Sequence, residues 1–173
     1  MSDAHAGAPG TVRLLRRALV LLAALGLVGT AVELALLRHW GSATRVIPWV
    51  ALAALAAGVV LLAVRPQRGT VLAVRALAVA GVLSALVGVY EHVAANHGAG
   101  PLDLRYADAW ATMSALSRWW AALTNSVGPS PVVAPAVLAQ VALCLLFATV
   151  HHPALRVPDG SRGPSVMPPS PVA

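Results

Sequence analysis

The feature that most constrains this chain is an apolar run at residues 18–40, ALVLLAALGLVGTAVELALLRHW, with one carboxylate, Glu33, near its far end. About 20 consecutive apolar residues are enough for a helix to cross the hydrocarbon core of a bilayer. An ionisable group inside such a helix is costly and marks a site with a role in packing or function. The run therefore predicts a transmembrane helix over residues 18–38, with a polar site close to one membrane surface.

The composition indicates a chain whose main solvent is lipid. Of the 173 residues, 58% are hydrophobic and 10% are charged, and the mean hydropathy is +0.77, whereas a soluble domain has about 25% charged residues. All twelve basic residues are arginines, which together with the excess of Ala, Val, Leu, Gly and Pro indicates a high-GC bacterial genome. The net charge of +6 does not indicate a nucleic-acid partner, because the arginines lie one to three at a time beside apolar runs.

Three more apolar segments follow and predict an all-α fold, a membrane bundle of four transmembrane helices. The spans are expected at about residues 18–38, 46–64, 71–94 and 132–151. At about 1.5 Å per residue, each is long enough for a hydrocarbon core of about 30 Å with little tilt. The transmembrane domain is expected to cover residues 13–155, and the tails at residues 1–12 and 156–173 are expected to be disordered.

The long connection between the third and fourth spans predicts one amphipathic helix in the membrane interface, at about residues 104–124. Aromatic and apolar side chains recur there at spacings of three or four, with Asp108 and Arg118 between them. Such a segment is too polar to span and lies in the interface, where tryptophan side chains are preferred. The main interpretation is an aromatic anchor without a ligand, and the alternative is a lid over the outer mouth of the bundle.

The arginine positions predict that both termini lie in the cytoplasm. With four spans, eight arginines flank the side that carries the termini and four flank the other side, and short cytoplasmic loops are the ones enriched in basic residues. We therefore expect a multi-pass protein of the bacterial cytoplasmic (inner) membrane, with the lipid bilayer as its main partner. The small-residue faces of four short spans are also compatible with a homodimer or a larger membrane complex.

Polar side chains gather near the expected outer surface. They are Glu33, His39, Glu91, His92, Asn96 and His97. Glu33 shares a helix face with Gly26 and Thr30, and His92 and Asn96 share a face with Gly88, at steps of three or four residues. Small residues on both faces indicate close packing between membrane helices. We therefore expect a contact between Glu33 and His92 inside the bundle.

Several functions are open for this polar site. The main interpretation is a structural clasp, in a protein with a structural or accessory role and no resident cofactor. One alternative is a proton- or cation-coupled small transporter, in which Glu33 and His92 exchange protons with a substrate; His39, Glu91 and Asn96 complete this candidate set. Another alternative is a metal site formed by Glu33, His39, His92 and His97, whose ligand types suit zinc, iron or copper, or a bis-histidine haem.

The remaining polar residues in apolar surroundings do not indicate an enzyme. No nucleophile–base pair, phosphate loop or paired carboxylates can be assigned to one depth, and the one cysteine, Cys144, cannot form an intramolecular disulfide. We expect Gln140 to form an interhelical hydrogen bond. His151 and His152 are expected at a helix C-terminus, where protonated imidazole is favoured.

Short strings at the ends of the spans form a pattern. They are ELALLRHW (33–40), IPW (47–49), GVYEHVAAN (88–96), PVVAPA (131–136) and HHPAL (151–155). Over about residues 15–155, the chain resembles an uncharacterised group of small bacterial four-span membrane proteins, which implies a fold but no activity. The matching positions of that pattern are Glu33, His39, His92 and Asn96. The chain is also similar to small multidrug-resistance exporters in having a Glu in its first span, but those proteins are shorter, carry that Glu at mid-membrane and lack a long loop before the fourth helix.

Overall fold

The computed structural model describes residues 8–156 and contains helices and no strands within that range. The four longest helices are α1 (Ala8–Leu36), α2 (Ala43–Val64), α3 (Arg68–Ala99) and α6 (Val133–Ala148). The short helices are η2 (Gly100–Leu102), α4 (Ala107–Trp110), α5 (Ala115–Leu123) and η3 (Pro153–Leu155). The predicted all-α fold class is confirmed.

Three of these helices are long and apolar enough to cross a membrane. The stretches that meet this criterion are Gly10–Leu36, Ala43–Val64 and Arg68–Leu102, and α6 is a shorter apolar helix. Large apolar side chains such as Leu25 and Leu86 are mostly exposed on the outside of the bundle. In water such a surface would aggregate, whereas lipid covers it without penalty. By the length and composition of its helices, the chain is a membrane protein.

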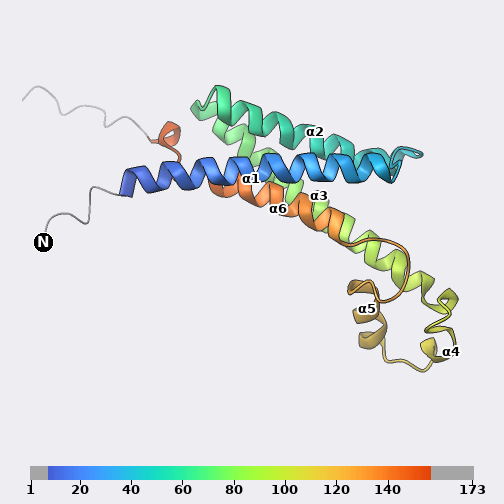
Figure 1. The fold of residues 1–173 in the computed structure, drawn as a ribbon. Coiled ribbons are helices and arrows are strands. Elements are labelled where there is room, and N and C mark those ends of the chain that lie inside the picture. The colour runs from blue at the N-terminus through green and yellow to red at the C-terminus, as the bar shows by residue number, and fades with distance from the viewer. Residues whose placement is uncertain (1–7, 157–173) are drawn as a thin grey trace, which may run out of the picture.

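Figure 1 shows where the long helices cross. Glycines lie at these crossings and allow the helices to approach closely. Gly81 of α3 lies against Leu55 of α2 and Ala142 of α6, and Gly26 of α1 lies against Val141 of α6. A Cβ atom on Gly26 would come within 2.6 Å of the Val141 side chain, so the close approach of α1 and α6 depends on this glycine. The result is that α6 lies between α1 and α3. The core of this crossing includes Leu27, Leu55, Val74, Leu138 and Leu145.

The last turns of α3 run past α1 and α2 and carry a second, smaller core (Figure 1). We call residues 93–130 the cap; it contains the end of α3, η2, α4, α5 and the loop that leads to α6. The buried hydrophobic residues of this second core are Val93, Trp110, Ala121, Ala122 and Val127. We call the end of the bundle that carries the cap and the α1–α2 turn the outer end, and the opposite end the inner end.

The helix boundaries differ from the predicted ones at both termini. α1 begins at Ala8, so the predicted disorder of residues 1–12 is wrong for residues 8–12; residues 1–7 and 157–173 lie outside the described part of the chain. The extra turns of α1 carry Arg16, which bonds to α6. α3 continues to Ala99 instead of ending near residue 94. Its last turns are held because Asn96 bonds to Ser130 and His97 stacks on Trp119.

The single interfacial helix predicted at residues 104–124 is instead two helices, α4 and α5, separated by residues 111–114. The Ser114 hydroxyl accepts a hydrogen bond from the backbone N–H of Ser117 at 3.1 Å. A serine in this position satisfies a free N–H at a helix start and therefore begins a new helix. The amphipathic pattern predicted helical structure, but not this break.

Candidate functional site

Two of the predicted site residues, His39 and His92, lie close enough at the outer end to interact electrostatically. His39 belongs to the turn after α1, and its carbonyl oxygen accepts a hydrogen bond from the indole N–H of Trp49 at 2.8 Å. Burial lowers the pKa of His39, and the positive charges of Arg45 and of protonated His92 lower it further. The neutral imidazole is therefore the favoured form of His39 near neutral pH.

Buried polar atoms without a partner occur on α1, on α3 and, at the Nε atom of Arg118, on α5. Within residues 8–156, the Nδ1 atom of His92 and the Oγ1 atom of Thr30 are buried and accept or donate no hydrogen bond. Polar atoms in a protein interior nearly always have a partner, so each exception is a candidate for binding something else. Both residues belong to the helix faces that the spacing of small residues predicted to be inward.

The two acidic candidates, Glu33 and Glu91, have no ionic partner in the part of the chain that the structure describes. The one ion pair there joins Arg105 to Asp103 at 2.8 Å. Glu33 is partly buried on α1, and Glu91 is exposed on α3. Glu33 and His92 are therefore not joined by an ion pair in this structure, and their functional contact stays a prediction.

His97, a predicted metal ligand, belongs to an aromatic cluster in the cap. Its ring stacks on Trp119 with centroids 4.4 Å apart and meets the edge of Trp110 at 5.4 Å. Trp110 is buried against Gly100, where any Cβ atom would overlap the indole ring. Across residues 8–156, no three His, Cys, Asp or Glu side chains converge in a way that could hold a metal ion. The predicted metal site stays a prediction.

Asn96 forms the densest hydrogen-bond network at the outer end. Its side-chain NH₂ group donates to the carbonyl oxygens of Ser130 (2.8 Å) and Ala122 (3.2 Å) and to the side-chain oxygen of Asn125 (3.1 Å). Its side-chain oxygen accepts from the backbone N–H of Ser130 at 2.8 Å. The loop closes tightly over it because Gly128 has a φ of +79°, where a Cβ atom would lie 2.6 Å from the Cα atom of Asn96. We call these contacts the outer clamp.

A second set of contacts joins α6 to the bundle at the inner end. The Arg75 guanidinium donates to the hydroxyl of Thr149 at 3.0 Å and to its carbonyl oxygen at 2.7 Å, and Arg16 donates to the carbonyl oxygen of Ala148 at 2.8 Å. The last carbonyls of a helix have no partner inside the helix and carry partial negative charge, so guanidinium groups are favoured there. We call these contacts the inner clamp.

His152 lies beside the inner clamp and is buried. Its Nδ1 atom accepts a hydrogen bond from the backbone N–H of Ala154 at 3.2 Å. Burial lowers the pKa of His152, and the nearby Arg16 and Arg75 lower it further. The expectation that a protonated imidazole is favoured at this helix end is therefore wrong for His152, because burial disfavours the charged imidazole and the two nearby arginines repel a further positive charge.

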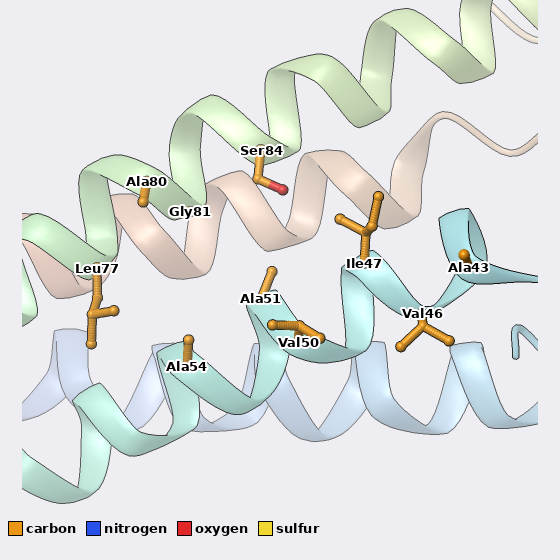
Figure 2. Close-up of a pocket in the computed structure, with 10 residues that line it drawn as sticks. All are labelled: Ala43, Val46, Ile47, Val50, Ala51, Ala54, Leu77, Ala80, Gly81 and Ser84. Atoms are coloured by element: carbon orange, nitrogen blue, oxygen red, sulfur yellow. The ribbon is translucent and has the colours of Figure 1, made fainter.

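An apolar groove of about 350 Å³ opens between α2 and α3 (Figure 2). Six residues of α2 between Ala43 and Ala54 line it, together with four residues of α3 between Leu77 and Ser84. Ser84 is the polar member of this set, and its hydroxyl points into the groove (Figure 2). A groove with this lining suits apolar chains and offers little to orient a polar substrate.

The histidines and the asparagine among the predicted site residues fall into two groups at the outer end. The structure brings His39 near His92, and it holds Asn96 and His97 in the cap. The inner clamp was not among the predicted features of the sequence. No protein-family model, no curated protein and no solved structure matches this chain.

Proposed function

We propose that this chain is a four-span integral protein of the bacterial cytoplasmic membrane with a structural or accessory role. In this proposal α6 is the fourth span and both termini lie in the cytoplasm. The observation that carries it is the pair of clamps that join α3 to the chain just before and just after α6. Asn96 bonds to Ser130 at the outer end, and Arg75 bonds to Thr149 at the inner end. Both sets of contacts thus hold parts of the chain together.

The spacing of the two clamps supports a transmembrane position for α6. Asn96 follows Arg75 by 21 positions on α3, which is about 31 Å at the rise of an α-helix. Thr149 follows Ser130 by 19 positions. A bilayer core is about 30 Å thick, so the separation of the two clamps matches the thickness of the core. Residues 130–149 therefore run alongside the part of α3 between the two clamps, although α6 itself has 16 residues.

The distribution of arginines supports the orientation. The inner end carries Arg16 and Arg75 of the inner clamp, together with arginines at both helix ends of the α2–α3 turn. Long basic side chains near a span end extend their charge to the headgroups. Positive residues are retained on the cytoplasmic side, so the inner end is assigned to the cytoplasm.

Reporter fusions on the full-length chain test the number of spans. We expect N-terminal and C-terminal fusions to green fluorescent protein to fluoresce in the cytoplasm, while alkaline phosphatase inserted at Leu104, a fully exposed cap residue, is active outside. A fluorescent N-terminal fusion combined with a C-terminal phosphatase that is active outside would reject α6 as a span.

One observation favours a second candidate, the proton-coupled transporter. His92 has a buried Nδ1 atom without a partner, and the neighbouring His39 favours its neutral form. A proton flux assay in liposomes with an internal pH-sensitive dye separates the two functions. The structural proposal predicts no flux above protein-free liposomes. A flux that disappears in folded Glu33→Gln and His92→Gln variants would replace it with the transporter.

A further inference from the structure

Gln140 is an exposed polar residue in the middle of α6. Its side chain makes no hydrogen bond with any residue between 8 and 156, so the predicted interhelical bond is not made within the described chain. Its depth follows from its neighbours on α6, because Val141 lies against Gly26 and Ala142 lies against Gly81. Both glycines are near the middle of helices long enough to span. Gln140 therefore lies near mid-membrane if α6 spans, as proposed above.

The carboxamide of Gln140 requires a partner at this depth. It carries two N–H donors and one carbonyl acceptor, and the hydrocarbon core offers neither water nor polar groups to pair with them. The side chain is also too short to reach the headgroups, which lie about 15 Å away, half of the core thickness. Residues 8–156 supply no hydrogen-bond partner, and a second polypeptide inserted beside α6 can supply one.

The surface around Gln140 has the spacing of a helix-packing seam. The exposed residues of α6 are Val133, Ala136, Gln140, Leu143 and Phe147, and Val150 just after the helix continues the series. They follow one another at alternating steps of three and four, the pattern with which helices pack in left-handed pairs. Apart from Gln140 the seam is apolar, and Ala136 one turn away is small enough to let a second helix approach closely.

We propose that α6 pairs along this seam with α6 of a second copy of the chain, around a two-fold axis perpendicular to the membrane. The axis gives both copies the same insertion direction and brings Gln140 opposite Gln140 of the partner subunit. The carboxamide is complementary to itself, because each N–H group donates to the carbonyl oxygen of the other copy. The dimer thus satisfies the exposed amide without any other component.

Cysteine cross-linking in native membranes tests the seam. The full-length chain first receives Cys144→Ala, which removes its one cysteine, and then a single cysteine by Ala136→Cys or Leu143→Cys. Val79→Cys is the matched control, since Val79 is exposed near the middle of α3. We expect copper-phenanthroline to give disulfide-linked dimers for the two α6 positions and none for the control. No cross-link at the α6 positions, or a stronger one at position 79, overturns the proposal.

A second experiment tests the amide itself. Dimer dissociation is measured in liposomes by energy transfer between dyes attached at Leu104→Cys in the Cys144→Ala background. We expect Gln140→Leu to weaken the dimer about three- to tenfold, as for other membrane hydrogen bonds, and Gln140→Asn to weaken it less. Equal dissociation constants for Gln140→Leu and the parent overturn the role of the amide. The C-terminal reporter fusion in the same background separates this failure from a failure of α6 to span.

Discussion

The two ends of the α3–α6 pair are held by different kinds of side chain, a neutral amide at the outer end and charged arginines at the inner end. At the outer end a neutral amide, Asn96, is 0% exposed and satisfies four partners at once. At the inner end, Arg75 and Arg16 are partly exposed and donate to the carbonyl end of α6. A neutral group can be fully buried without the desolvation penalty of a charge, whereas an arginine keeps its charge near the headgroups. The outer clamp should therefore be intolerant of substitution, and the inner clamp should be more tolerant. The pH dependence expected at the inner end comes from His152, which lies beside the inner clamp, whereas the outer clamp contains no group that titrates.

The largest effect is expected for Asn96→Leu. Leucine has the same branched shape but leaves the carbonyl oxygen and the N–H of Ser130 without partners, and it removes one of the donors to the carbonyl oxygen of Ala122. Each unsatisfied buried group costs about 1–3 kcal/mol, so the free energy of unfolding should fall by about 3 kcal/mol or more. The measurement is SDS-induced or thermal unfolding in detergent micelles.

A matched control for this variant is Asn125→Gly. Asn125 has a φ of 56°, a conformation that glycine adopts without strain, so this change removes one hydrogen-bond acceptor and keeps the loop. The expected loss is about 1 kcal/mol. Equal losses in the two variants would mean that Asn96 does not organise the outer clamp.

The next effect tests how closely the loop approaches Asn96. Gly128→Ala introduces a Cβ atom 2.6 Å from the Cα atom of Asn96 at a positive φ, and we expect a loss of about 2 kcal/mol with faster amide exchange around Ser130. Gly98→Ala is the control, because Gly98 is helical and has open space around it, and it should be neutral or stabilise by up to about 1 kcal/mol. A harmless Gly128→Ala would contradict the tight loop closure.

The inner clamp should respond less to substitution. Arg75→Gln removes two charge-assisted hydrogen bonds from a partly exposed group, so the expected loss is about 1–2 kcal/mol; Arg16→Gln should lose less. A double-mutant cycle with Thr149→Val isolates the bond from Arg75 to the Thr149 hydroxyl. If Thr149→Val has the same effect with and without Arg75, that bond contributes nothing.

The contrast between the clamps also explains what could be predicted from the sequence. Apolar length predicted the helices, and the spacing of small residues assigned Asn96 and His92 to an inward face, where Asn96 is buried and His92 partly buried. The hydrogen-bond partners of these side chains could not be predicted. Arg75, for example, bonds to a residue 74 positions away, and the packing that brings the two together is not specified by any local pattern. The break before α5 was not predicted, although Ser114 is a residue type that favours the start of a helix.

The candidate site was predicted less well than the fold for a related reason. Helical periodicity gives the face and depth of a side chain, but not the angle between two helices, and α3 diverges from α1 toward the outer end (Figure 1). Glu33 and His92 therefore share an expected depth without an ion pair between them. For Gln140, the chemistry of the side chain predicted an interhelical hydrogen bond, but residues 8–156 do not supply its partner.

The smallest effect is the pH dependence of the inner end. The pKa of His152 is lowered in the folded state, first by burial and then by Arg16 and Arg75. The folded protein therefore binds fewer protons than the unfolded chain, and stability rises with pH. The contribution of His152 is fully present above its unfolded pKa of 6.5 and is lost as the pH falls from there through the folded pKa.

Unfolding measured between about pH 7.5 and about pH 5 covers this window, in which histidine is the side chain that titrates. His39 at the outer end contributes with the same sign, because its pKa is also lowered, so His39→Asn and His152→Asn are compared separately. Asp103 stays ionised throughout, since hydrogen bonds from Arg105 hold its pKa at about 2. We expect His152→Asn to remove the part of the pH dependence of stability that His152 causes. Asn125→Gly should leave the pH dependence of the parent unchanged, because the outer clamp contains no group that titrates. A pH slope that survives in the His39→Asn/His152→Asn double variant would show that neither imidazole causes it.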